Sequence, residues 1–534
     1  MLSSFHALFA EGGLQAADYV VVILYFIFMI WIGVYFSGRQ KSGEDYFVAG
    51  RSMPWIAVGL SLFSALLSTI SYLAVPGETI SQGFAYCLGL LHIPFSYAVI
   101  YFVLIPFFMR LGVVSAYEYL ERRFSRVVRV FGAGLFMLYC LGWMATVVLT
   151  CSVGLQQMTG WPLWVILICN GLVSTVYTTL GGMRAVIWTD VAQAVLMLGG
   201  GVLTLIYVGL ATNTTPADWW RDAEGIGRLD FPWFSLNPSV RQSVFWIAMN
   251  MFAWMICTHG GNQVALQRYF TMSTPREARG MLLVKMAAEI IMALLLVATG
   301  FALLSFYLRR GDLLPEALSL ADKQKADKIF PHFIAHQLPP VFAGGVVAAL
   351  FAAAMSTISS GVNSMAAVFT IDFYQPAQPR KTSDPEQIRV GVGFTAVSGL
   401  LITAIAWGLT QLPGEHNFVD LMQKAFNFLL GPLGGLFLIG MFFPRCTTRS
   451  AIPATILGLG VGVLLAYWEQ FFKEPFSPYW VIACSCGATL ISAGLLGLTE
   501  PRRDRKRMAG LTWRTLVFPD GAKTPATPDQ NVRS

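Results

Sequence analysis

The sequence carries little charge. Only 12% of its 534 residues are Asp, Glu, Lys or Arg, whereas 55% are hydrophobic. The charged residues fall between apolar runs of roughly 18 residues or more, the length that crosses the hydrocarbon core of a bilayer. This composition excludes a soluble globular domain. We expect an all-α polytopic protein of the plasma (inner) membrane.

Residue patterns of catalysis and of nucleic-acid binding are also missing. The six histidines are scattered, and neither His-Glu-x-x-His nor Gly-x-Ser-x-Gly occurs. The eight cysteines lie mostly inside apolar runs without metal or disulfide spacing. The net charge of +7 resides in loops and not on one helical face. We therefore expect no enzyme, no organic cofactor and no nucleic-acid partner, and keep an intramembrane enzyme only as a distant alternative.

The apolar runs predict about thirteen membrane spans. They lie near residues 17–37, 55–75, 83–109, 130–156, 162–179, 185–211, 241–267, 281–308, 341–369, 389–410, 418–443, 449–468 and 478–499. Alternate loops are rich in Arg and Lys, and the basic tail falls on the same side as these loops. Because basic loops stay in the cytoplasm, we expect the N-terminus outside and the C-terminus inside.

The ninth predicted span contains a row of hydroxyls. Ser356, Ser359 and Ser360 stand at i, i+3 and i+4 and share one helical face. Neutral hydroxyls at membrane depth suit a small hard cation that needs several oxygen ligands. The alternative is that small residues allow close helix packing, with each hydroxyl bonded back to its own helix.

Two predicted spans contain polar interruptions. The second holds several serines and threonines before Pro76-Gly77-Glu78, and the seventh contains Thr258-His259-Gly260-Gly261-Asn262-Gln263. These spans are five apart, so two five-span units would be inserted with opposite orientation. Broken helices at matching positions of inverted repeats indicate a midplane binding site in a secondary transporter. A kink without a ligand is the alternative.

Several motifs, found in order along nearly the whole chain, resemble the sodium/solute symporter family. They are residues 44–51 (EDYFVAGR), 181–193 (GGMRAVIWTDVAQ), Asn262-Gln263 with Gln267-Arg268, the serine row running on to Asp372, and Gly434-Gly435 through Pro444-Arg445. The resemblance implies a leucine-transporter-type fold of two inverted five-helix repeats. It is closer to the monocarboxylate, multivitamin and iodide branch, and in part to the sialic acid branch, than to sugar carriers.

The resemblance also implies a division of the chain. We expect an extra helix in 1–40, repeat 1 in 41–212, an extracellular loop in 213–240, repeat 2 in 241–445, two further helices in 446–500 and a cytoplasmic tail in 501–534.

Position by position, the resemblance implies where one or two sodium ions would bind. The first set combines the carbonyls of Ser64, Leu67 and Ala353 with the hydroxyls of Ser356 and Thr357. The second set consists of Asp190, Ser356, Ser359 and Ser360.

Asp190 also has a simpler interpretation, as a carboxylate near the interface that is paired with Arg184. As a cation ligand or exit-path residue, its replacement by Asn would weaken sodium dependence and leave folding intact.

The solute is less well defined by the sequence. Ala85 stands where sugar carriers of the family would place an acid, which disfavours a hexose. An organic anion would suit helix N-termini at the breaks and a bound sodium ion. Candidate contacts are Ser68, Ser71, His92, Thr258, His259, Asn262 and Gln423. Glu289 and Lys285 are spaced as an i, i+4 ion pair, but a Glu289 facing the cavity would favour a cationic or zwitterionic solute.

Together these features predict a sodium-coupled symporter of a small organic solute, working by alternating access as a monomer in the bilayer. A proton-coupled symporter of the same fold, or a sodium-coupled sugar or amino-acid carrier, remains the alternative.

Overall fold

The computed structural model describes residues 13–36, 42–380, 382–411, 418–501 and 508–518. Within these ranges the chain is helical and contains no β-strand. The α-helices are α2 Ala16–Phe36, α3 Gly43–Val48, α4 Trp55–Leu66, α5 Thr69–Gln82, α6 Ile93–Val99, α7 Ile105–Phe108, α8 Tyr117–Arg123, α9 Arg126–Thr159, α10 Leu163–Thr212, α11 Pro216–Gly225, α12 Val244–Gly261, α13 Gln263–Phe270, α14 Pro275–Arg309, α15 Lys323–Ala326, α16 Ile329–His336, α17 Phe342–Val368, α18 Gln375–Ala377, α19 Asp384–Leu409, α20 Phe418–Met422, α21 Phe428–Phe442, α22 Thr448–Ala466, α23 Trp468–Phe472, α24 Val481–Leu498 and α25 Trp513–Val517.

Shorter helical turns join some of these helices. Four are 3₁₀ turns, η1 Ala49–Arg51, η2 Gly83–His92, η4 Gly311–Leu313 and η7 Pro478–Trp480. Three are π-helical, η3 Ile100–Leu104, η5 Phe369–Tyr374 and η6 Gln423–Asn427. Helical segments occupy every predicted apolar run.

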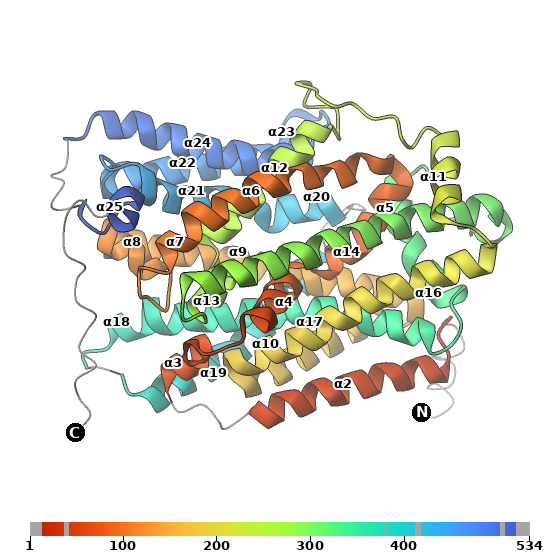
Figure 1. Cartoon of the computed structure of the whole chain (residues 1–534), viewed down its shortest axis with the longest axis horizontal. Helices are drawn as coiled ribbons and strands as arrows, with labels where there is room; N and C mark the ends of the chain where they lie inside the picture. Colours follow the sequence, from red (N-terminus) through yellow and green to blue (C-terminus); the bar gives the residue numbers. More distant parts are fainter. Residues whose placement is uncertain (1–12, 37–41, 381, 412–417, 502–507, 519–534) are drawn as a thin grey trace.

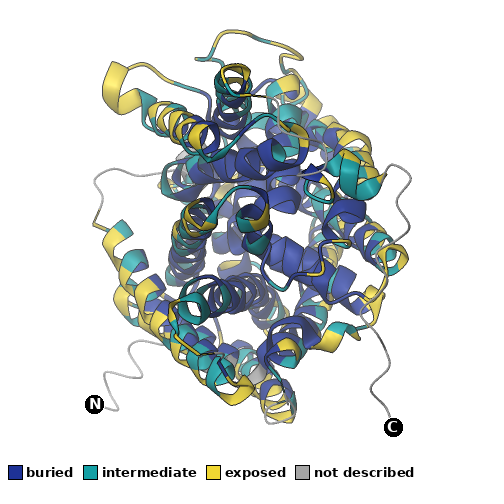
Figure 2. Cartoon of the chain, turned by 90° about the vertical axis from the view of Figure 1, so that its left-hand side faces the viewer, coloured by how far each residue is buried: buried dark blue, intermediate teal, exposed yellow. Residues whose placement is uncertain are grey.

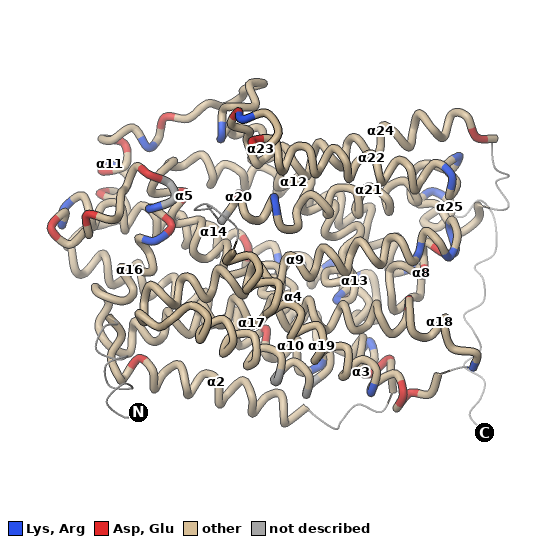
Figure 3. The backbone as a smooth tube through the Cα atoms, turned by 180° about the vertical axis from the view of Figure 1, so that it is seen from behind, with Lys and Arg blue, Asp and Glu red and all other residues tan. Residues whose placement is uncertain are grey.

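Ten helices of the described chain are long and apolar enough to cross a membrane, and two shorter apolar helices, Trp55–Leu66 and Leu163–Thr175, accompany them. Most of the long helices run along the long axis of the molecule (Figure 1). Charged residues gather toward the two ends of that axis (Figure 3). This arrangement confirms the predicted polytopic helical membrane protein; the count of thirteen crossings stays a prediction.

Burial separates central helices from peripheral ones. In the most apolar stretch of the segment that contains α17, 83% of the residues are buried, compared with 22% in α2. The end-on view shows buried residues in the middle and exposed ones on the outer helices (Figure 2). A helix that is apolar on all sides, yet carries hydroxyls, is therefore surrounded by protein and not by lipid.

Three glycine or polar positions interrupt the long apolar runs. Gly182 (φ 57°, ψ −172°) divides α10 into two helices. Gly83 (φ 81°, ψ −150°) ends α5, and the following segment η2 packs against α12. The chain between Leu66 and Thr69 is extended, with ψ of 112° at Leu67 and 168° at Ser68. Pro76 lies inside α5, so the second predicted span breaks before it.

The turn at Gly83 yields a prediction about stability. A Cβ added at Gly83 would overlap the backbone carbonyl oxygen of Arg228, whereas Gly112, also at positive φ (61°), has no atom within 4 Å of its added Cβ. Both Ala substitutions strain the backbone by about 1–2 kcal/mol, but only Gly83→Ala adds a clash. We expect Gly83→Ala to lower the melting temperature of the detergent-solubilised protein clearly more than Gly112→Ala does. Equal shifts would contradict this packing.

Candidate cation and solute sites

The break between α4 and α5 leaves backbone oxygens without helical partners. The carbonyls of Ser64 and Leu67 would bond to N–H groups four residues later in a continuous helix, but the extended segment prevents this. Both carbonyls instead face α17, which belongs to the most buried of the ten long apolar segments. The break thus creates acceptors inside the protein that another element must satisfy.

Two hydroxyls of α17 meet these carbonyls. Ser356 Oγ lies 3.0 Å from the carbonyl oxygen of Ser64, and Thr357 Oγ1 lies 3.3 Å from that of Leu67. The carbonyl oxygen of Ala353 is 3.3 Å from Ser356 Oγ and 3.1 Å from Thr357 Oγ1. The structure thus brings together all five residues of the first predicted set.

These five oxygens form what we call the first oxygen set, and all of them are neutral. Each carbonyl and hydroxyl oxygen has lone pairs available for a metal ion. A set without carboxylates can hold a monovalent cation but gives little compensation for a divalent one. Among the described residues, no group of three His, Cys, Asp or Glu side chains could hold a transition metal. The chemistry of the set therefore fits sodium.

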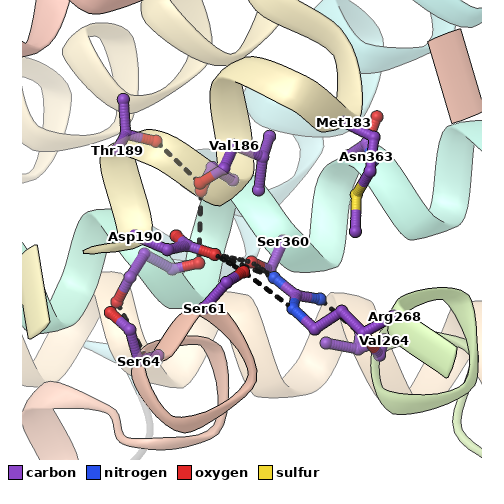
Figure 4. Close-up of polar contacts among 12 residues, drawn as sticks. Ser61, Ser64, Met183, Val186, Thr189, Asp190, Val264, Arg268, Ser360 and Asn363 are labelled. Atoms are coloured by element: carbon purple, nitrogen blue, oxygen red, sulfur yellow. Dashed lines mark hydrogen bonds and ion pairs between the residues drawn. The ribbon is translucent and has the colours of Figure 1, made fainter. Parts of the chain in front are cut away.

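Asp190 of the second predicted set forms an ion pair that the sequence did not indicate. Asp190 Oδ2 lies 2.9 Å from Arg268 Nη2, and both side chains are 0% exposed. Ser61 Oγ donates to the same carboxylate oxygen at 2.6 Å and accepts from Arg268 Nε at 3.0 Å. Figure 4 shows these side chains converging from α10, α4 and α13. Arg184 instead lies 3.5 Å from Asp45, so the alternative pairing of Asp190 with Arg184 is wrong.

The serines of the second set are only partly assembled. Ser360 Oγ is 3.4 Å from Asp190 Oδ2 and accepts from Arg268 Nη2 at 2.5 Å. Ser359 Oγ donates to the carbonyl of Ser356 in its own helix. Asp190 Oδ1 is buried without a hydrogen-bond partner among the described residues. Asp190 and Ser360 thus form one cluster with Arg268, while Ser356 belongs to the first oxygen set.

A cavity of about 210 Å³ lies beside the helix break. Four of the predicted solute contacts, Ser68, Ser71, His92 and Gln423, line this cavity. Its other residues are mainly aromatic or aliphatic; the larger and polar ones are Phe63, Tyr86, Trp143, Asn250, Trp254, Lys285, Glu289, Phe426, Asn427 and Tyr479. A small solute with an apolar body and few polar groups would match such a lining.

Three predicted contacts do not line the cavity. Asn262 Oδ1 accepts from the N–H of Val264 at 2.9 Å and caps α13. His259 Nδ1 is hydrogen-bonded to the Tyr269 hydroxyl. Thr258 is fully buried outside the cavity lining. The three residues lie at or just before the second break, at Asn262 (φ −90°, ψ 117°), and the Asn262 side chain serves the helix end there.

The sequence missed several cavity residues. Asn250 and Trp254 stand four residues apart on α12 and share a face, a spacing that could have indicated them. Lys285 and Glu289 were recognised as an i, i+4 pair, and Lys285 Nζ lies 2.7 Å from Glu289 Oε2. Both residues also line the cavity, so Glu289 is paired with Lys285 and faces the cavity at the same time.

Ion pairs also join elements at opposite ends of the molecule. Near the cavity, Arg241 lies 2.9 Å from Asp420 of α20 and 3.7 Å from Glu78 of α5. At the other end, where α8 and α18 lie (Figure 1), Arg129 at the start of α9 is 2.6 Å from Asp372 of η5. We call these the Arg241 and Arg129 clusters.

Comparison with known proteins decides the family. A sequence profile of the sodium:solute symporter family matches residues 46–458. The chain belongs to this family. The resemblance found in the motifs is confirmed, and so, at the level of the family, is the predicted function of sodium-coupled symport.

Individual relatives agree. The chain is 30% identical to the sodium/sialic acid symporter NanT of Aliivibrio fischeri, over 85% of this chain and 87% of that protein. It is 31% identical to the human sodium/iodide cotransporter, over 84% of this chain and 68% of that protein. It is 33% identical to the sodium-dependent multivitamin transporter of Oryctolagus cuniculus, over 84% of this chain and 70% of that protein.

Solved structures support the fold. The chain resembles a Na⁺-coupled sialic acid symporter, solved in a substrate-bound outward-open state, with a TM-score of 0.79 and 26% identity over 92% of this chain and 99% of that chain. Mhp1, a nucleobase–cation-symport-1 family transporter, shares the fold with a TM-score of 0.54 and 14% identity, over 88% of this chain and 98% of its own. The neighbours have the leucine-transporter-type fold, and the relatives are transporters, not enzymes.

The buried ion pair changes what we expect of Asp190. Asp190→Asn leaves the Arg268 guanidinium buried without its counter-charge, which costs about 3–5 kcal/mol. The sequence-based expectation of intact folding is therefore replaced by a clear loss of stability. Changing Arg268 to Gln as well removes the unpaired charge, so we expect the double variant to melt above Asp190→Asn alone. A single variant as stable as the unmodified protein would show that the pair does not form.

Proposed function

We propose that the first oxygen set binds the sodium ion that drives uptake of a small organic solute into the cell. The supporting observation is that carbonyls from the α4–α5 break and hydroxyls of α17 lie within 3.0–3.3 Å of each other. A cation between them would hold the broken helix against α17 and fix the wall of the neighbouring cavity. Sodium and solute would then stabilise each other's binding, as coupling requires.

The cavity holds the solute in this proposal. Ser68 directly precedes α5, and Ser71 lies in its first turn; both line the cavity. The neighbouring carbonyl of Leu67 belongs to the first oxygen set. The N-terminal end of a helix attracts negative charge, which supports the expectation of a carboxylate or another anionic group on the solute. A sugar carrier is disfavoured because the lining is largely apolar.

In this proposal transport works by alternating access, and the two breaks and the two ion-pair clusters support it. The broken helices α4–α5 and α12–α13 occupy corresponding places in proposed inverted repeats at 41–212 and 241–445. Together with η2–α7 and α14 they form a bundle that rocks against the remaining helices. The Arg241 cluster closes the outer path and the Arg129 cluster the inner path, with the N-terminus outside and the C-terminus inside. We assign the protein to the plasma (inner) membrane as a monomer.

One sodium ion supplies enough free energy for concentrative uptake. A single charge crossing 100 mV releases about 2.3 kcal/mol, and a tenfold sodium gradient adds about 1.4 kcal/mol. Together they could accumulate a neutral solute about 500-fold. A second ion at Asp190 would raise this limit, but Arg268 already supplies a positive charge there.

Flux measurements in proteoliposomes test the proposal. We expect sodium-dependent, saturable uptake in a screen of monocarboxylates, sialic acid, vitamins, proline and sugars. Uptake that follows a proton gradient equally well without sodium would favour the proton-coupled alternative.

The oxygen ligands can be tested separately. Ser356→Ala and Thr357→Ala each remove one hydroxyl ligand, and we expect about a tenfold or larger rise in the sodium concentration for half-maximal uptake. Thr455→Ala is a matched control, because this buried hydroxyl of α22 donates to the Ala451 carbonyl of its own helix and, among the described residues, to no other element. Unchanged sodium dependence in both α17 variants would refute the assignment.

A further inference from the structure

The two charged side chains that line the cavity differ in how far they are exposed. Lys285 and Glu289 both line the cavity, but the Lys285 side chain is 2% exposed and that of Glu289 is 24% exposed. The ammonium is enclosed between Glu289, the ring of Tyr97 and the sulfur of Met255. The carboxylate of Glu289 is therefore the charge that a solute in this cavity would meet.

One oxygen of this carboxylate is already engaged. Glu289 Oε2 accepts from Lys285 Nζ at 2.7 Å and from the Tyr97 hydroxyl. No hydrogen bond to Oε1 occurs among the described residues. Lys285 and Tyr97 thus fix the orientation of the carboxylate and leave one oxygen to accept a further donor. A carboxylate on the solute would repel it, whereas an ammonium group would complement it.

At the helix break, the cavity instead favours a negative group on the solute. Ser68 and Ser71 line the same cavity at the start of α5, a helix of 14 residues. The first α5 hydrogen bond across the break runs from the Tyr72 N–H to the Ser68 carbonyl, so the N–H groups of the preceding residues have no helical acceptor. This end of the cavity favours a negative group, and the proposed sodium ion beside it adds to the effect.

Between these two ends the wall is mainly apolar, with Asn250, Gln423 and Asn427 as its uncharged amide side chains. Aromatic rings of Trp143, Trp254 and Phe426 face the cavity together with aliphatic side chains such as Leu296 and Val297. Such a wall would bind a hydrocarbon or aromatic body, and its few amide side chains would offer partners to only a few additional polar groups of a solute.

We infer that the transported solute is a small apolar zwitterion, with its ammonium group on Glu289 and its carboxylate at the α5 terminus beside sodium. This inference rests on the proposed function, because it uses the same cavity and the same sodium ion. Glu289 is thereby the residue that separates zwitterions from simple monocarboxylates.

Matched probes test the inference. Each set shares one skeleton: L-leucine, 4-methylpentanoate and 3-methylbutylamine; and L-phenylalanine, 3-phenylpropanoate and 2-phenylethylamine. Binding is measured as the thermal stabilisation of the purified protein in NaCl and in KCl. We expect a zwitterion of at least one set to stabilise the protein in NaCl more strongly than its carboxylate and its amine do.

Variants at Glu289 then locate the selectivity. Loss of a charged hydrogen bond predicts a tenfold to hundredfold weaker binding of that zwitterion by Glu289→Gln, so that it binds no better than its carboxylate. Glu289→Asp keeps the charge and the partner for Lys285, and we expect it to retain the order of preference at reduced affinity. Glu277→Gln, in the half-buried capping box at the start of the same helix and outside the cavity lining, serves as the matched control and should behave as the unmodified protein.

The outcomes separate the two levels of the proposal. Carboxylates that bind as well as zwitterions, failure of every zwitterion, or a Glu289→Gln variant with unchanged preference would overturn the inference about the solute. Stabilisation by NaCl alone, without solute, would persist in these cases and preserve the proposed sodium site. Absence of any difference between NaCl and KCl would instead contradict the proposed function.

Discussion

The site depends on one constraint: the carbonyl oxygens released by the α4–α5 break must find partners inside the protein. The hydroxyls of Ser356 and Thr357 meet them at 3.0 and 3.3 Å. A hydroxyl can donate to a carbonyl, or turn its lone pairs with that carbonyl toward a cation. The same atoms can therefore close the gap in two ways, and in the proposed function a cation would hold the broken helix against α17 in place of these hydrogen bonds.

Two kinds of buried polar interaction lie around this gap, and we assign them different roles. The first oxygen set is neutral and suits an ion that enters and leaves, because no fixed counter-charge holds it permanently. The cluster of Asp190, Arg268, Ser61 and Ser360 is charged, internally paired and fully buried. It joins α10, α13, α4 and α17. Separating these helices would leave a buried charge unpaired, which costs much free energy. We interpret the cluster as a structural link between the proposed rocking bundle and the remaining helices.

Local sequence patterns predicted the elements that a helix creates by itself. The run at Ser356, Ser359 and Ser360 fixed a common face, and the polar stretches near Ser68 and Asn262 indicated where helices break. The Lys285–Glu289 pair followed from spacing alone. Contacts between distant segments could not be read in this way. Arg268 pairs with Asp190, 78 residues away in the sequence. Asn262 caps a helix, although its polarity had suggested a contact with the solute. Only the packing of the helices decides such pairings.

The most direct test of the account is hydrogen–deuterium exchange of the protein in NaCl compared with KCl. Sodium held by the first oxygen set would tie residues 64–71 to residues 353–357, so we expect slower exchange in both segments in NaCl and little change in the peripheral helix α22. If sodium leaves both segments unchanged, or slows exchange only elsewhere, a cation does not bridge the broken helix and α17.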